Sequence, residues 1–176
     1  LLYLKSQQYT EAGQLLSDYQ VRCPDNKGVY SLQAQLELAN GNREGAIEAY
    51  RTILTLDPKD IGTLYALTLL VSDTGDLYEA ENLAEQLNRQ FPDNPLGSIV
   101  DGLIAYHGGD YKLAKLKLQK GLGNNTDNTG SFFLGLSHSA LGEFEQALNT
   151  FQQVLDRYPN NNRARVMVAM TLFRQK

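Results

Sequence analysis

The side chains best suited to catalysis or metal binding in this chain are two histidines, His107 and His138. They lie 31 residues apart, near the ends of two expected helices. A metal site or an acid–base site needs a carboxylate or a cysteine at helical spacing from the histidine, and neither histidine has a convincing one. We therefore interpret both as structural residues and expect no bound metal.

The single cysteine, Cys23, stands just before Pro24 at an expected helix end. A nucleophilic role would need a paired base, so we expect a small structural residue that is buried or half-buried. One cysteine also excludes an internal disulfide framework. The pair Gly121 and Gly123 has no Lys-Ser or Lys-Thr behind it, so it does not form a phosphate-binding loop. These features predict a chain that is not an enzyme and holds no cofactor.

The net charge and the lengths of the apolar runs argue against two further classes of function. The formal net charge is -4 and the sequence pI is near 5.2, which argues against a nucleic-acid binder because such a protein needs a basic stripe. No apolar run approaches the roughly 18 residues of a membrane-inserted helix. One segment carries four lysines, which could attract an acidic partner or a membrane surface, although a solvated face explains them better. These are Lys112, Lys115, Lys117 and Lys120.

An internal repeat organises the 176 residues, since three residue types recur with nearly the same spacing. Alanine recurs in steps of 34, 34, 34 and 33, at Ala12, Ala46, Ala80, Ala114 and Ala147. Glycine recurs in steps of 34, 34 and 33, at Gly41, Gly75, Gly109 and Gly142. Proline recurs at Pro24, Pro58, Pro92 and Pro159. The one-residue slip falls in the connector at residues 121–128, which lacks the periodic proline.

Each periodic residue has a physical role. The glycine suits the left-handed residue that closes a helix, and the residue after it, such as Asn42, Asp76 or Asp110, is a good N-cap for the next helix. The alanine suits a place where two helices approach closely, and the proline ends the second helix. Each unit therefore predicts a helix, a tight turn, a second helix and a loop.

This pattern resembles the tetratricopeptide repeat, with Tyr30, Ala34, Gly41, Ala46, Tyr50 and Pro58 at signature positions of one unit. The unit at 61–94 departs from it, with Thr68 where glycine or alanine is usual. The resemblance covers the whole chain and implies an all-α, right-handed superhelical α-solenoid of antiparallel helix pairs. We expect one array, with a partial repeat at 1–26, full repeats at 27–60, 61–94, 95–127 and 128–161, and the first helix of another at 162–176. Helices are expected near 8–22, 27–40, 43–56, 61–74, 77–90, 95–107, 111–121, 129–141, 144–157 and 162–175.

The resemblance also implies a binding surface, because first-helix positions 2, 5, 6, 9, 12 and 13 of the family tend to face the concave side. Outside the first full repeat, this stripe is strongly apolar and aromatic. The residues expected to contact a partner are Tyr65, Leu69, Ile99, Leu103, Tyr106, Phe132, Leu136, Val166 and Met170. Chaperone-binding members clamp a terminal carboxylate with lysine and asparagine, and positions 5 and 9 have neither here. An apolar or amphipathic protein segment is therefore the expected ligand.

Three functional hypotheses remain open: a protein-binding scaffold, a structural spacer or homodimer-forming module, and the docking arm of a longer enzyme such as a glycosyltransferase. Both ends of the chain fall within the repeat pattern, so we expect a piece of a longer array, and the missing signal peptide says nothing of the compartment. Residues 132–148 and 163–173 resemble large bacterial repeat lipoproteins of the exosortase (PEP-CTERM) and exopolysaccharide systems. That resemblance implies protein sorting or polysaccharide export at the envelope, in the periplasm or beside a membrane; a cytoplasmic location is the alternative.

Overall fold

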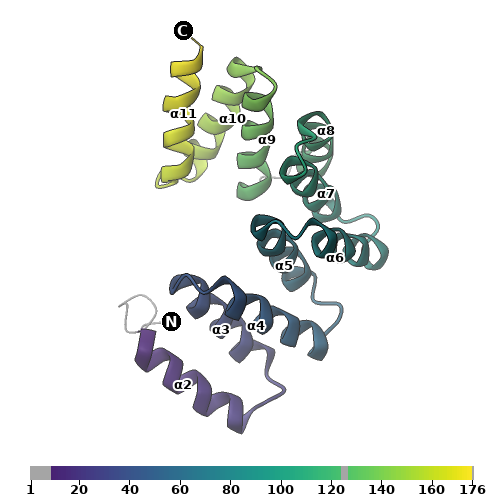
Figure 1. Cartoon of the computed structure of the whole chain (residues 1–176), viewed down its shortest axis with the longest axis vertical. Coiled ribbons are helices and arrows are strands. Elements are labelled where there is room, and N and C mark those ends of the chain that lie inside the picture. Colours follow the sequence, from purple (N-terminus) through teal and green to yellow (C-terminus); the bar gives the residue numbers. More distant parts are fainter. Residues whose placement is uncertain (1–8, 124–126, 176) are drawn as a thin grey trace. The chain divides into compact units, whose positions relative to one another are not determined.

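The computed structural model describes residues 9–123 and 127–175, and within these residues it contains ten α-helices and no β-strand (Figure 1). The helices are α2 (Tyr9–Arg22), α3 (Lys27–Ala39), α4 (Arg43–Leu56), α5 (Ile61–Thr74), α6 (Leu77–Gln90), α7 (Pro95–His107), α8 (Tyr111–Leu122), α9 (Asn128–Ala140), α10 (Phe144–Arg157) and α11 (Asn162–Arg174). Every helix lies within one residue of its predicted bounds at each end. The all-α fold class is confirmed, although part of the predicted connector, residues 124–126, lies outside the described residues.

The periodic glycines close the first helix of each pair, as predicted. Gly41, Gly75, Gly109 and Gly142 have φ angles of 78°, 91°, 83° and 76°, in the left-handed region that favours glycine. In three of these turns the next residue caps the second helix. Asn42, Asp76 and Asp110 each accept a hydrogen bond from a backbone N–H three residues on, at 3.1, 3.0 and 3.0 Å.

The chain divides into two compact units, Leu1–Val71 and Ser72–Lys176, and the division falls within α5. Each unit is described by itself, and the expectation of one continuous array stays a prediction. The first unit contains α2, α3, α4 and most of α5. At the contact of α3 and α4, Ala34, Ala46 and Ala49 are buried, and Tyr50 and Leu70 pack against them. All five periodic alanines are buried, which fits the close helix contacts expected of them.

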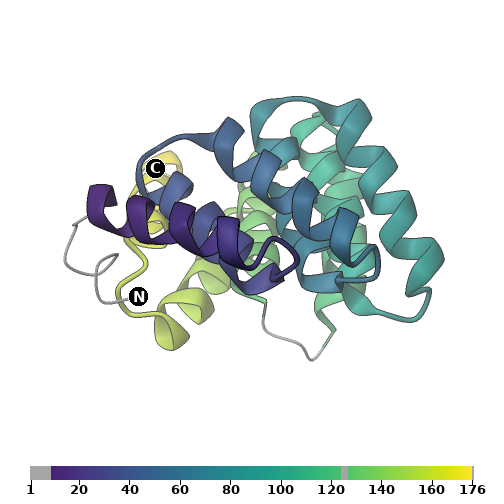
Figure 2. The same cartoon turned by 90° about the horizontal axis from the view of Figure 1, so that it is seen from below.

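The second unit contains α6 to α11, with α7 beside α8 and α9 beside α10 in both views (Figures 1 and 2). Two glycines let these helix pairs approach closely. A Cβ atom at Gly102 of α7 would lie 2.6 Å from Cγ of Leu118 on α8. A Cβ atom at Gly135 of α9 would lie 2.6 Å from Cε1 of Phe151 on α10. The interior of this unit therefore combines backbone on one helix with a large side chain on the other.

Two residues that depart from the expected pattern behave differently in the structure. Thr68, in place of the usual glycine or alanine, is fully buried, and its hydroxyl donates a hydrogen bond of 2.7 Å to the carbonyl oxygen of Leu64. The hydroxyl is thus satisfied within its own helix. The expectation that Cys23 is buried or half-buried is wrong. It directly follows the last residue of α2, at the start of the turn to α3, and it is exposed.

Candidate protein-binding surface

The nine predicted contact residues lie on four first helices. Tyr65 and Leu69 are on α5, in the first unit, and both are half-buried. The other seven are on α7, α9 and α11, in the second unit. We therefore describe the predicted surface within the second unit, where α7 packs against α9, and α11 packs against α9 and α10.

Two of the seven, Ile99 and Leu103, are buried, with 0% and 2% of their surface exposed. Ile99 lies where two neighbouring helices present glycine. A Cβ atom at Gly121 of α8 would lie 2.7 Å from Cγ1 of Ile99, and one at Gly130 of α9 would lie 3.1 Å from its Cγ2. Ile99 and Leu103 thus belong to the helix packing, and the accessible predicted residue on α7 is Tyr106.

Aromatic rings connect α7 to α9 and then to α10. The Tyr106 and Phe133 ring centroids are 5.0 Å apart in an edge-to-face arrangement, and Phe133 meets Phe132 at 6.0 Å. Phe132 in turn lies 5.7 Å from the buried ring of Phe151. Tyr106, Phe132 and Phe133 are each half-buried, so every ring is held by the interior on one side and exposed on the other. We call Tyr106, Phe132 and Phe133 the aromatic row. Such edge-to-face contacts add roughly 0.5–1.5 kcal/mol each beyond the buried area.

Burial changes the acid–base properties beside the aromatic row. His107 packs on Phe133 with ring centroids 5.3 Å apart, and desolvation by burial lowers the pKa of its imidazole, although the Asp73 carboxylate opposes the shift. Burial also raises the pKa of the Tyr106 hydroxyl, and Tyr111 adds to this effect. At neutral pH the rings of the aromatic row and the His107 imidazole are therefore uncharged.

Sequence reasoning missed Phe133 and His107 as members of this surface. Phe133 and His107 occupy positions 6 and 13 of their repeats, and both positions belong to the family's concave stripe. The signal was therefore present in the sequence. Leu136 on α9 is half-buried, so the structure places part of it at the surface with its neighbours Phe132 and Phe133.

Helix α11, which is the first helix of its repeat, is the most exposed part of the predicted surface. Val166 and Met170 are both exposed, and Phe173, one turn further along, has 81% of its surface exposed. The opposite side of the helix is fixed in the unit by Ala164 and Thr171, which are buried. The helix therefore presents an apolar face that makes few contacts within the described residues.

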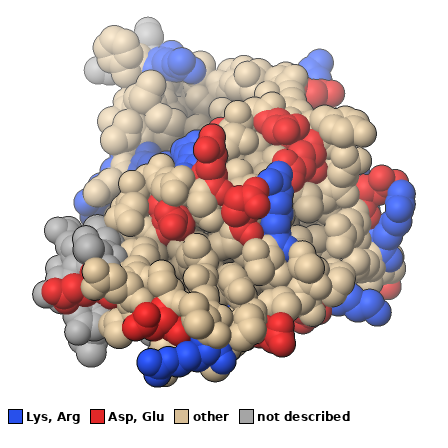
Figure 3. All heavy atoms as spheres, turned by 60° about the horizontal axis from the view of Figure 1, so that its bottom comes forward, with Lys and Arg blue, Asp and Glu red and all other residues tan. Residues whose placement is uncertain are grey.

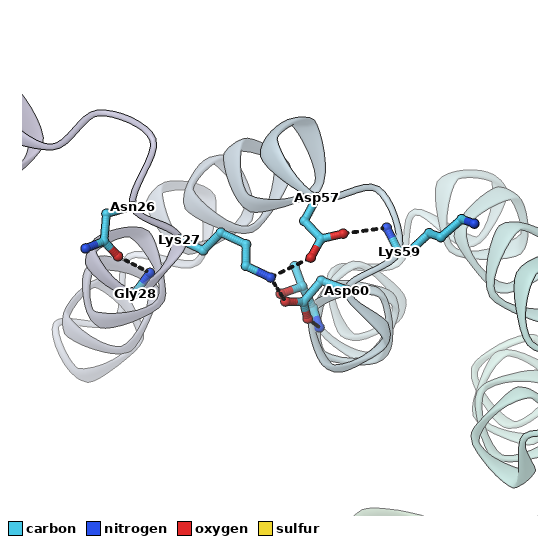
Figure 4. Close-up of polar contacts among 7 residues, drawn as sticks. Asn26, Lys27, Gly28, Asp57, Lys59 and Asp60 are labelled. Carbon is cyan, nitrogen blue, oxygen red and sulfur yellow. Dashed lines mark hydrogen bonds and ion pairs between the residues drawn. The ribbon is translucent and has the colours of Figure 1, made fainter.

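In the first unit, a hollow of about 400 Å³ lies between α3 and α5. Its walls are small residues, including Gly28, Ser31 and Ala66, with the Tyr50 side chain among them. At its edge the Lys27 ammonium lies 2.5 Å from Oδ2 of Asp57 and 3.0 Å from Oδ2 of Asp60 (Figure 4).

These ion pairs connect the first turn of α3 to the loop between α4 and α5 (Figure 4). Hydrogen bonds to the two carboxylates raise the pKa of Lys27. The bond from Lys27 lowers the pKa of Asp57, and the backbone N–H of Thr63 lowers that of Asp60. Because two carboxylates share one ammonium, Lys27 presents no net positive charge to a ligand's carboxylate.

Neither histidine has a carboxylate at helical spacing in the sequence, but the structure gives His138 a carboxylate partner across a turn. Its Nδ1 lies 2.5 Å from Oε2 of Glu143, and Oε1 of Glu143 lies 2.6 Å from the ammonium of Lys115. His138 is buried, so this contact joins α8, α9 and the start of α10. Within the described residues, no group of three or more His, Cys, Asp and Glu side chains could hold a metal ion.

Family comparisons agree with this architecture. One tetratricopeptide repeat model matches residues 37–98, and another matches residues 1–61 and 134–176. The chain belongs to the tetratricopeptide repeat family. Repeats of this family generally mediate protein–protein interaction and typically form scaffolds without enzymatic activity.

A curated relative, the cellulose synthase 2 operon protein C of Komagataeibacter xylinus, is 36% identical over 64 residues. Those residues are 36% of this chain, and the chain spans only 5% of that protein's length.

Solved tetratricopeptide structures share the fold at low sequence identity. TTC0263, a thermophilic protein of Thermus thermophilus, has a TM-score of 0.76 at 20% identity, covering 98% of this chain and 94% of its own. The APC/C hetero-tetramer Cut9–Hcn1 gives 0.82 at 20% identity, covering 99% of this chain and 35% of that one. PilW, a type IV pilus biogenesis factor, gives 0.73 at 16% identity, covering 97% and 81%.

Charged side chains of both signs are mixed on one face of the molecule (Figure 3). On the face drawn in Figure 3, acidic and basic side chains lie next to one another and most of the surface is uncharged. Across the described residues, no helix combines the length and the apolar character needed to cross a bilayer.

Proposed function

We propose that this chain is a protein-interaction scaffold that binds an apolar or amphipathic segment of a partner protein on its first-helix face. The observation that carries the proposal is the aromatic row on α7 and α9, whose rings are half-exposed and packed against each other. The exposed Val166 and Met170 on α11 extend the apolar character of these first helices. Rings held in place by their neighbours lose little conformational freedom when a ligand binds, which makes them good anchors.

The lack of a free cation at these positions favours an apolar ligand over an anionic one. The His107 imidazole is kept neutral by its lowered pKa, and the Lys27 ammonium is already shared by Asp57 and Asp60. A terminal carboxylate would therefore find no free cation at these positions. The apolar face of a helix, with side chains at helical spacing, matches the rings better.

The proposed setting is a bacterial envelope assembly for protein sorting or polysaccharide export, with the protein in the periplasm or associated with the membrane. Support comes from the resemblance of residues 132–148 and 163–173 to envelope repeat lipoproteins, and from the relative that belongs to a cellulose synthase operon. In this setting the chain would hold a partner protein in place and leave the chemistry to other components.

The test is site-specific photo-crosslinking in the native cell, with the whole protein carrying a photoreactive residue at Met170 or Tyr106. We expect both positions to crosslink to the same partner, and we expect none from Gln119, which is exposed on the second helix α8. The double variant Val166→Asp with Met170→Asp should abolish capture without loss of helicity, because both side chains are exposed. Crosslinks from Gln119 alone, or capture that survives the double variant, would refute the proposed surface.

Self-association is a second candidate, favoured by the exposure of Phe173 together with Leu172 on α11. A homodimer would cover these side chains. Light scattering across a concentration series distinguishes the two functions: a mass that doubles with concentration, and remains single in Phe173→Asp, supports the dimer. A constant monomer mass excludes it.

A further inference from the structure

A hollow of about 610 Å³ lies in the second unit between α6, α7 and α8, away from the aromatic row. These three helices are neighbours in Figure 1. Apolar side chains form much of its lining: Leu77, Ala84, Ile104, Ala105 and Leu113. The hollow is large enough for a long side chain and part of its neighbour.

Charged residues surround this apolar lining, and most of them are already paired. The Lys117 ammonium lies 2.9 Å from Oδ2 of Asp101. The other carboxylate oxygen, Oδ1, accepts a hydrogen bond of 3.0 Å from Nδ2 of Asn88. Arg89 pairs with Glu85 one turn earlier on α6. Two carboxylates of the lining, those of Glu81 and Asp110, make no ion pair within the part of the chain that the structure describes. The hollow therefore has an excess of negative charge beside an apolar wall.

The next repeat shows how the equivalent place can be filled. Positions 11 and 16 of the repeat at 95–127 are Ala105 and Asp110, and position 21 of the repeat before it is Glu81. One repeat later the same positions carry His138, Glu143 and Lys115. There the imidazole and the ammonium both contact the Glu143 carboxylate, at 2.5 and 2.6 Å. In the hollow, Ala105 stands where the other place has His138, so the space is open. Glu81 stands where the other place has Lys115, so no cation faces the Asp110 carboxylate from this position.

We propose that this hollow binds an arginine side chain from a basic, amphipathic segment of a partner protein. The guanidinium would lie between the Glu81 and Asp110 carboxylates, and its planar group can donate to both. The aliphatic stem would cover Ala105 and Ile104. Exposed apolar residues beside the hollow, Leu113 and Leu116 on α8, then meet the apolar neighbours of that arginine. This site is separate from the first-helix face and does not depend on it.

The test uses a labelled synthetic peptide with leucine and arginine at helical spacing, and the same peptide with glutamine for arginine. We expect the arginine peptide to bind the intact chain and to shift the amide signals of residues 77–117 in NMR spectra. The affinity should fall by about tenfold in Glu81→Gln with Asp110→Asn, since two partly exposed ion pairs are lost. Asparagine keeps the N-cap that Asp110 gives to α8. Loss of the shifts with the glutamine peptide supports the proposal.

A charge-matched control separates this site from general attraction to an acidic protein. Glu44→Gln with Glu145→Gln removes the same charge from exposed positions on α4 and α10 and should leave the affinity unchanged. Glu81→Lys with Ala105→His copies the residues of the next repeat, so it should fill the hollow and abolish binding while helicity is kept. Equal weakening in the charge-matched control, or full binding by the filled variant, would overturn the proposal. A lysine peptide that binds as tightly as the arginine peptide would overturn the assignment of a guanidinium.

Discussion

Replacing Gly135 with alanine tests how closely α9 and α10 approach each other. The added methyl group would lie 2.6, 2.8 and 2.9 Å from three atoms of the Phe151 ring, which is fully buried and also packs against Phe132. Overpacking of this kind costs roughly 1–3 kcal/mol, and three contacts below 3.0 Å favour the upper half of that range. Alanine gains about 1 kcal/mol over glycine in a helix interior, so we expect a net loss of about 1–2 kcal/mol.

Native-state hydrogen exchange measures this loss where it occurs, because stability in a repeat protein is distributed over neighbouring helices. A loss of about 1.4 kcal/mol should speed the exchange of α9 and α10 amides about tenfold. Gly13→Ala in α2 is the matched control, since its methyl group would lie 3.6 Å from Leu36, an ordinary contact. That variant should slow exchange in α2. If Gly135→Ala also slows exchange, the reasoning from close helix approach is refuted.

A double-mutant cycle identifies the ring as the cause. In a Phe151→Leu background, which removes the ring atoms nearest to Gly135, alanine at position 135 should cost about 2 kcal/mol less than in the native chain. The same cost in both backgrounds would place the strain elsewhere.

Three further predictions follow from the electrostatics and the exposure of single groups. Hydrogen bonds from Lys115 and His138 lower the pKa of Glu143 below its usual value of 4.5, so its stabilisation should be present above pH 4.5 and lost as the pH falls below it. Urea unfolding should show this loss, and Glu143→Gln should reduce it. The depressed pKa of His107 should appear in NMR titrations as a midpoint below 6.5, and stability from this group should fall as the pH drops below 6.5; a midpoint above 6.5 would contradict its desolvation. The Cys23 thiol should react completely with a thiol reagent in the folded chain, and reaction only after unfolding would show that it is buried.

The helices could be predicted closely because each boundary has a local cause in the sequence. Gly41 ends one helix with a left-handed residue and Asn42 starts the next by capping it, so both ends are set within a few residues. A helix boundary of this type needs no knowledge of the tertiary contacts. The same holds at Gly109 and Asp110, which is why the predicted and observed helices agree within one residue.

The exposure of the proposed binding residues was harder to predict because it depends on how closely the neighbouring helices approach. The repeat position of Ile99 indicates the side of the helix on which it lies, but Gly121 and Gly130 let two helices cover it. The contact of His138 with Glu143 was missed for a related reason. The two residues are five apart across a turn, and Lys115 comes from another helix 28 residues away, so no helical spacing connects them.

The comparison of two equivalent places in the repeat shows where this chain's own specificity lies. Alanine and glycine recur with the period because the helix contacts and turns of every unit need them, so they carry information on the fold alone. Positions 11 and 21 are free of that requirement, whereas position 16 carries the residue that caps the second helix at Asn42, Asp76 and Asp110. Where residues 95–127 meet residues 128–161, these positions form a closed contact of His138, Glu143 and Lys115. One repeat earlier, Ala105, Asp110 and Glu81 line an open hollow. On the proposal above, substitutions at these positions open or close a binding site while the periodic alanines and glycines stay in place. The residues that break the repeat are therefore the ones to mutate first in a search for partners.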